Sequence, residues 1–177
     1  MKHKSWLILT ASLVLASLLG SGGGTWAYYN DTEISTCNNF IAWVSNMWNQ
    51  TNQDDFDAGV LINTDTSTSL GNVQLNTGYS SGSLASQVLD TGINGASWDA
   101  LCWDKTLPSG TVITFKVRAS DTIFTKDAIT PAWVPVGDNS PVIPGLSSGR
   151  YKQWQAILTT TDISKTPTLQ AVRVYYR

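Results

Sequence analysis

Histidine and glutamate are almost absent from this chain. The only histidine of the 177 residues is His3 and the only glutamate is Glu33. His3 belongs to a basic head before an apolar stretch, so a chain that loses this leader has no histidine. Without histidine there is no Ser-His-Asp or Cys-His catalytic arrangement and no histidine-ligated zinc or iron site. Two aspartates can still serve a glycosidase, but no spacing singles out a pair. We therefore expect no enzyme and no bound cofactor.

Charged residues are also few, at 14% of the chain, and none of them form a basic run. Of the 11 basic residues, Lys2 and Lys4 lie in the same leader, whereas all 13 acidic residues follow it. The remaining chain is mildly acidic. This charge balance argues against nucleic acid or anionic lipid as a partner.

The leader itself has the pattern of a secretory signal peptide. A basic head precedes an apolar stretch over residues 5–20, and small residues follow over residues 21–27. The apolar stretch is roughly 15 residues long, shorter than the ~20 that a membrane-spanning helix needs, which disfavours the alternative of an uncleaved anchor. We expect cleavage after Ala27, with Tyr28 as the new N-terminus and no membrane span left afterwards.

The region around this cleavage site resembles the processing region of the TasA/camelysin family. The resemblance rests on residues 22–31, GGGTWAYYND, and residues 32–42, TEISTCNNFIA. In the family pattern, a small-residue run and an aromatic precede Asx-Asp, and a polar stretch ends in Asn-x-Phe-x-Ala. The resemblance spans about residues 10–45. It implies a SipW-type signal peptide, secretion, and a place in an extracellular filament, a pilus or the biofilm matrix, or on the cell surface.

The tail over residues 28–39 is polar and lacks strand alternation, as free termini often do. The resemblance instead implies that this tail leaves its own subunit and completes a neighbour's sheet as a donor strand. Such a head-to-tail contact does not close, so it propagates as a fibre. The partner is then the protein itself, with other matrix proteins or glycans as further candidates. The expected assembly residues are Tyr28, Tyr29, Phe40, Trp43 and Trp48.

Two cysteines remain after the leader, Cys37 and Cys102. An isolated pair in an exported chain usually forms a disulfide. The simple alternative is a bond within one chain, which would stabilise it by roughly 4 kcal/mol through closure of a loop of about 65 residues. If the tail is donated, Cys37 travels with it and the bond joins two subunits. The sequence leaves both pairings open.

Residues 40–177 predict an all-β domain, a jelly-roll-like β-sandwich of about eight strands. Apolar residues fall at every second place in Ile113–Ala119, as in a half-buried strand, and turn formers separate this run from the others. Residues 78–176, including GRYKQW at 149–154 and TPTL at 166–169, are also similar to β-sandwich modules of secreted proteins. The predicted strands are Phe40–Asn49, Ala58–Asn63, Asn72–Asn76, Leu84–Leu89, Ser97–Trp103, Val112–Ala119, Arg150–Thr160 and Thr168–Tyr176.

Other residues predict three further kinds of site. Trp133 lies in a Pro-containing loop and is the best exposed aromatic for stacking on a glycan, whereas Trp98, Trp103 and Trp154 lie in strands and are expected in the core. The alternative function is therefore a monomeric cell-surface carbohydrate-binding or adhesion module. Hard oxygen ligands suit calcium, and N-glycosylation requires Asn-x-Ser/Thr triplets. The calcium candidates are Asp54, Asp55, Asp57 and Asp65, and the glycosylation candidates are Asn30 and Asn49.

Overall fold

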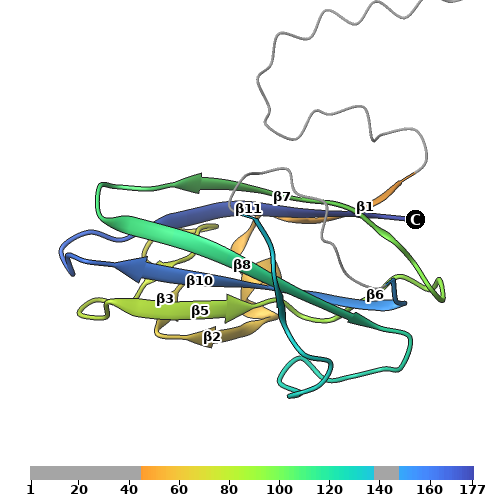
Figure 1. Cartoon of the computed structure of the whole chain (residues 1–177). Helices are drawn as coiled ribbons and strands as arrows, with labels where there is room; N and C mark the ends of the chain where they lie inside the picture. The colour runs from red at the N-terminus through yellow and green to blue at the C-terminus, as the bar shows by residue number, and fades with distance from the viewer. Residues whose placement is uncertain (1–44, 138–147) are drawn as a thin grey trace, which may run out of the picture. The chain divides into compact units, whose positions relative to one another are not determined.

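The computed structural model describes residues 45–137 and 148–177, all within one compact unit, Ile34–Arg177. Two antiparallel sheets pack face to face (Figure 1). The first has the order β1-β11-β7, and the second has the order β2-β5-β10-β8-β9, with β6 also beside β10. A third, two-stranded sheet pairs β3 with β4. The elements are β1 (Asn46–Gln50), α2 (Gln53–Asp57), β2 (Val60–Ile62), β3 (Thr64–Asp65), β4 (Gln74–Leu75), β5 (Ser81–Ala85), β6 (Leu89–Asp90), β7 (Trp98–Thr106), β8 (Thr111–Ser120), β9 (Val134–Pro135), β10 (Tyr151–Thr160) and β11 (Thr168–Tyr176).

The predicted all-β sandwich is confirmed, and each of the eight predicted strands overlaps an observed one. The described residues form eleven strands because the predicted strand Leu84–Leu89 is divided into β5 and β6, and because β3 and β9 are two-residue strands that sequence alternation cannot reveal. Of the predicted strand Phe40–Asn49, only the part from residue 45 onward is described, and β1 begins there at Asn46.

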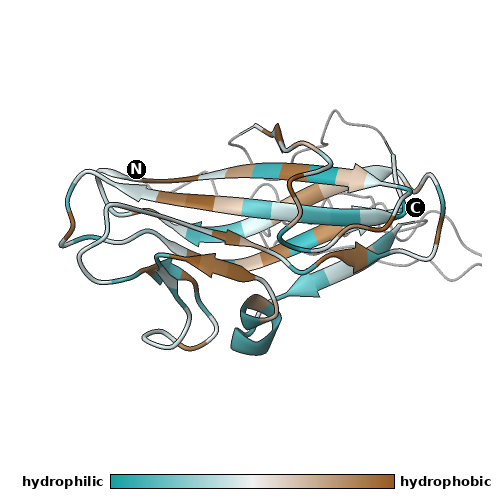
Figure 2. Cartoon of the chain, turned by 90° about the horizontal axis from the view of Figure 1, so that it is seen from below, coloured by the Kyte–Doolittle hydropathy of each residue, from teal (hydrophilic) through white to brown (hydrophobic). Residues whose placement is uncertain are grey.

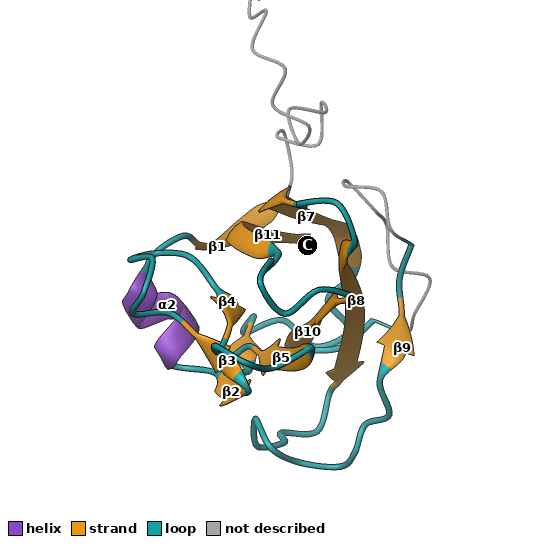
Figure 3. Cartoon of the chain, turned by 90° about the vertical axis from the view of Figure 1, so that its left-hand side faces the viewer, coloured by secondary structure: helices purple, strands orange, loops and turns teal. Residues whose placement is uncertain are grey.

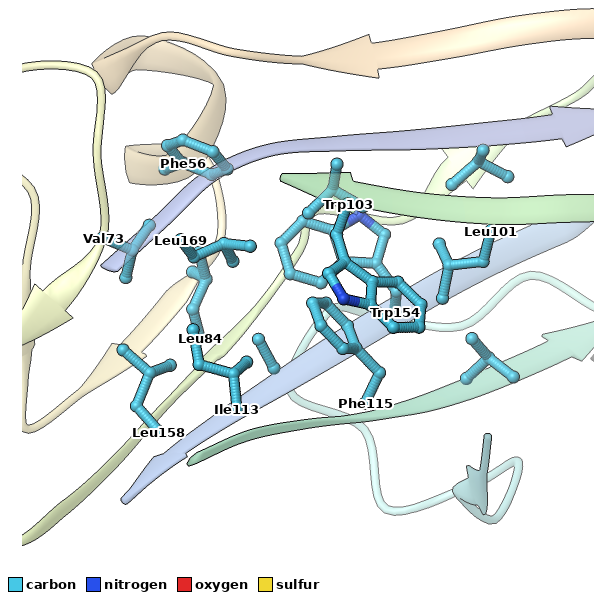
Figure 4. Packing of buried hydrophobic residues seen from close by; sticks show 14 of the residues in the cluster. Phe56, Val73, Leu84, Leu101, Trp103, Ile113, Phe115, Trp154, Leu158 and Leu169 are labelled. Carbon is cyan, nitrogen blue, oxygen red and sulfur yellow. The ribbon is translucent and has the colours of Figure 1, made fainter. Parts of the chain in front are cut away.

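The core lies between the two sheets. The alternation predicted in β8 is realised, because Ile113, Phe115 and Val117 are all buried. Phe115 stacks on Trp103 of the opposite sheet, with ring centroids 4.2 Å apart, and lies 6.2 Å from Trp154 on its own sheet (Figure 4). The three core assignments made for Trp98, Trp103 and Trp154 are therefore correct.

Alternation is also visible along the long strands as bands of hydrophilic and hydrophobic residues (Figure 2).

The sequence analysis does not predict the short helix α2. Asn52 accepts a hydrogen bond from the backbone N–H of Asp55, and the Asp55 carboxylate accepts one from the Asn52 N–H. This reciprocal cap starts the helix, and the buried ring of Phe56 anchors it. Five residues are too few to show a helical period in sequence. In the end view of Figure 3, α2 lies on the side opposite β9.

Candidate interaction surfaces

Strand β1 is an edge strand of the three-stranded sheet. Within residues 45–137 and 148–177 it pairs only with β11, in a register that places Met47 opposite Tyr175 and Asn49 opposite Arg173. Met47 is 54% exposed, and Asn46 and Asn49 are also exposed. The strand NMWNQ contains no charge and no proline, the devices that usually block an exposed sheet edge. This edge is chemically open to an added strand.

The other face of β1 holds it firmly in its own domain. Trp48 packs against the sandwich core. The buried side chain of Gln50 accepts a hydrogen bond of 2.7 Å from the indole N–H of Trp154 on β10 and donates one to the carbonyl of Asp55 in α2. Trp48, expected among the assembly residues, is therefore placed beside its own core. A segment that leaves for another subunit must end before Asn46.

A second exposed edge lies on β8. This strand pairs with β10 along its full length, but its other side meets β9 only at Lys116 and Val117. Pro135 of β9 has no N–H to donate, which suits it to an edge. Residues Thr111–Thr114 have no neighbouring strand on this side in the described part of the chain, and Val112 is 48% exposed there.

Arg118 organises the long connection between β8 and β9. Its guanidinium is buried and lies between the rings of Phe124 and Trp133, 4.8 Å and 4.3 Å from their centroids. It also donates to the side-chain oxygen of Gln153 and to the backbone carbonyls of Thr125, Lys126, Ala128 and Pro131. One face of Trp133, the predicted glycan platform, is thus taken up by Arg118, and the side chain is half-buried.

A buried lysine lies at one end of the sandwich. Lys152 of β10 is fully buried, donates a 2.8 Å hydrogen bond to the carbonyl of Ala96, and has its ammonium 4.8 Å from the ring centroid of Trp98. Burial lowers its pKa from 10.5 to about 8, and the nearby carboxylates of Asp99 and Asp121 offset only part of this effect. These two carboxylates have other partners, since Asp121 accepts from the N–H groups of Gly95 and Arg150, and Asp99 accepts from Ser97.

A polar groove of about 570 Å³ lies beside the β3-β4 pair. Its floor is held by the hydrogen bond from the Leu75 N–H to the Thr166 hydroxyl and by that from the Gln74 amide to the Thr168 hydroxyl, both 2.9 Å. Tyr79 and Ile163 are 48% and 66% exposed at its rim. The other lining residues are Asp65, Thr68, Asn76, Thr77, Ser164 and Lys165.

Three of the four aspartates predicted as calcium candidates, Asp54, Asp55 and Asp57, lie on the short helix α2, and Asp65 lies on β3. Asp55 caps α2, Asp57 accepts a 2.6 Å hydrogen bond from the Thr66 hydroxyl, and Asp65 accepts from Ser67 and Thr68. The hydrogen bonds to Ser67 and Thr68 hold the pKa of Asp65 well below its ordinary value. Residues 45–137 and 148–177 contain no group of three or more acidic, cysteine or histidine side chains placed to hold a metal. Calcium is therefore not part of the function proposed below.

Cys102 and Asn49 are the other predicted site residues that the structure describes. Cys102 is buried on β7 next to Ala100 and Tyr175, and Asn49 is exposed on β1. The remaining predictions lie outside the described residues: the signal peptide 1–27, the tail 28–39, the cleavage residues Ala27 and Tyr28, and Tyr29, Asn30, Cys37, Phe40 and Trp43. The disulfide, the cleavage site and glycosylation thus stay predictions.

Sequence reasoning missed Lys152, Arg118 and the groove. For Lys152 a signal exists, since regular alternation along β10 places it on the same side as the buried Trp154. For Arg118 there is none, because most of its partners lie in an irregular connection whose path no local pattern predicts, and for the groove there is none because it joins segments that are distant in sequence.

The chain matches no family model, and no curated protein is significantly similar to it. In the described part of the chain, no helix has the length and apolar character needed to cross a bilayer.

Proposed function

We propose that the secreted chain is a structural subunit of an extracellular filament, in which the N-terminal tail of one subunit adds a strand to the sheet of the next. The observation that carries this proposal is that β1 is an exposed edge strand without a charge, a proline or a bulge. Added strands gain main-chain hydrogen bonds at such an edge. The resemblance of residues 10–45 to the TasA/camelysin processing region supports the same assembly.

The integration of β1 into its own sandwich sets the boundary of the donated segment. Because Gln50 and Trp48 hold β1 to the core of its own domain, residues 28–39 are the proposed donor. The domain that these residues leave is expected to stay folded. Filament growth is then head to tail, since the donated tail and the receiving edge of β1 are different segments of the chain.

The test is negative-stain electron microscopy of the chain Tyr28–Arg177 beside a chain that begins at Phe40. We expect filaments from the first and single, folded particles from the second. A Cys37→Ser variant of the longer chain separates strand donation from any disulfide, because it keeps the tail. Single particles from both chains would reject the proposal and favour a monomeric binding module.

The receiving edge is tested by a matched pair of charge insertions. Met47→Lys places an exposed charge on β1, and Val112→Lys places one on the edge of β8, where exposure is similar. Because edge charges oppose strand addition, we expect Met47→Lys to abolish filaments and Val112→Lys to leave them intact. The reverse result would assign the acceptor to β8.

A further inference from the structure

The groove beside β3-β4 has the composition of a ligand site, and it is separate from both sheet edges discussed above. Its volume of about 570 Å³ lies within the range of small-molecule sites. Its floor is rigid, because β3 pairs with β4, and Val73, just before β4, is hydrogen-bonded in both directions with Leu169 of β11.

The rim of the groove presents apolar surface to solvent. Tyr79 follows the turn Asn76–Gly78, and its ring is exposed over about half its area. Ile163 is exposed on the facing loop. An exposed aromatic ring favours ligands that offer apolar C–H groups next to polar ones, because its face is apolar and its hydroxyl is not.

The polar lining is rich in neutral donors and acceptors. Gln74 uses its amide nitrogen for Thr168, so the carbonyl oxygen of its side chain has no hydrogen bond within the part of the chain that the structure describes. The Asn76 side chain is exposed at the groove. Amide side chains both donate and accept, which matches the two-way hydrogen bonding of hydroxyl groups.

The charges of the groove cancel. Among the described residues that line it, Lys165 is the only basic one and Asp65 the only acidic one, and the Lys165 ammonium already lies 3.6 Å from the carboxylate of Asp162. Recognition of phosphate or sulfate calls for an excess of basic groups, which this lining does not have. The ligand that fits is therefore uncharged.

We propose that this groove binds a neutral saccharide, with the face of Tyr79 against a sugar ring and the side chains of Gln74 and Asn76 on its hydroxyl groups. None of the described residues that line the groove lies on β1, so this site is separate from the edge proposed to receive the tail. The chain then has a second property, attachment to neutral polysaccharide.

The test is an NMR chemical-shift titration of the chain Tyr28–Arg177 carrying Met47→Lys, with cellohexaose, mannohexaose, xylohexaose and chitohexaose as probes. We expect at least one probe to shift the resonances of Tyr79, Asn76 and Lys165. The parent chain, without Met47→Lys, is titrated with the same probe by calorimetry. Agreement between the two chains shows that binding does not depend on filament formation.

Three variants decide the assignment. Tyr79→Ala should weaken binding by about tenfold or more, because it removes the stacking surface, and Tyr79→Phe should keep it. Ile129→Ala removes an exposed apolar side chain outside the groove (Ile129 is 92% exposed) and should change nothing. Binding should also be unaffected by salt, since the ligand is uncharged.

The proposal is overturned if none of the four probes binds, if Tyr79→Ala binds as well as the parent, or if the shifts centre on Trp133. Unfolding of Tyr79→Ala is not expected, because the side chain is exposed, and its melting temperature checks this.

Discussion

At the scale of single residues, two buried cations are held by different partners. Arg118 is surrounded by carbonyl oxygens and ring faces, which suit its planar, delocalised charge. Lys152 has one carbonyl and one ring, and its nearest carboxylates are shared with other groups. The charge of Lys152 is therefore less well stabilised than that of Arg118, in agreement with the lowered pKa of Lys152.

The pH dependence of stability should reveal this lysine. Its pKa falls from 10.5 in the unfolded chain to about 8 in the folded one, so between these values the unfolded state holds more protons. Stability contributed by this group therefore rises as pH increases from about 8 to 10.5. We expect Lys152→Met to lack this rise. The Ala96 carbonyl keeps its hydrogen bond from the Gly149 N–H in the variant, so no buried acceptor is left unpaired.

The measurement is urea unfolding of parent and Lys152→Met at pH 7, 8.5 and 10. The difference in free energy of unfolding isolates Lys152, because all other titrating groups are common to both proteins. A difference that does not change with pH would show that the lysine keeps an ordinary pKa in the folded domain.

At the scale of elements, the long connection between β8 and β9 is held by a single side chain. Four of its carbonyls accept hydrogen bonds from Arg118, and Lys126 within it reaches back to the carbonyls of Ala58 and Gly59 before β2. The connection has almost no regular structure of its own, so its order depends on these contacts.

We expect Arg118→Lys to loosen this connection. A lysine cannot fork between several carbonyls or stack flat between two rings, and the loss of two or more charged hydrogen bonds should lower the free energy of unfolding by about 2 to 4 kcal/mol. Trypsin should also cleave faster after Lys126. The matched control is Lys116→Arg, an exchange of the same two residue types at a half-exposed place on the same strand, which should change neither quantity. Equal proteolysis of Arg118→Lys and parent would contradict the assigned role.

At the scale of the whole molecule, the two sheets enclose the main core, whereas the proposed filament depends on the tail. Trp103, Phe115 and Trp154 join the sheets, and Gln50 joins β1 to β10. The predicted disulfide would connect this core, through Cys102, to the tail that carries Cys37.

We expect both cysteines of the mature, oxidised chain to resist maleimide labelling under denaturing conditions until a reductant is added. Cys37→Ser breaks the predicted bond without placing a hydroxyl in the buried environment of Cys102. If the bond lies within one chain, this variant should lose roughly 4 kcal/mol of stability. On a non-reducing denaturing gel, a monomer band identifies an intrachain bond and a ladder identifies bonds between subunits. Labelling of both cysteines without reductant would contradict the prediction.

The all-β class and the positions of the main strands follow from the sequence alone. Alternating apolar residues between turn formers are a local property, and strands such as β8 and β11 need only that pattern to be recognised. The same locality explains the helix that was missed, since α2 depends on a cap and one buried ring within five residues.

Which surfaces are available depends on how the chain folds. The sequence predicts Trp133 as an exposed platform, but Arg118, fifteen places earlier in the chain, covers one of its faces. No local pattern marks Tyr79, yet the loop that carries Ile163 and the segment around β4 together place it at a groove. Edges, grooves and buried charges arise from contacts between segments that are distant in sequence, and no local pattern encodes which segments will meet.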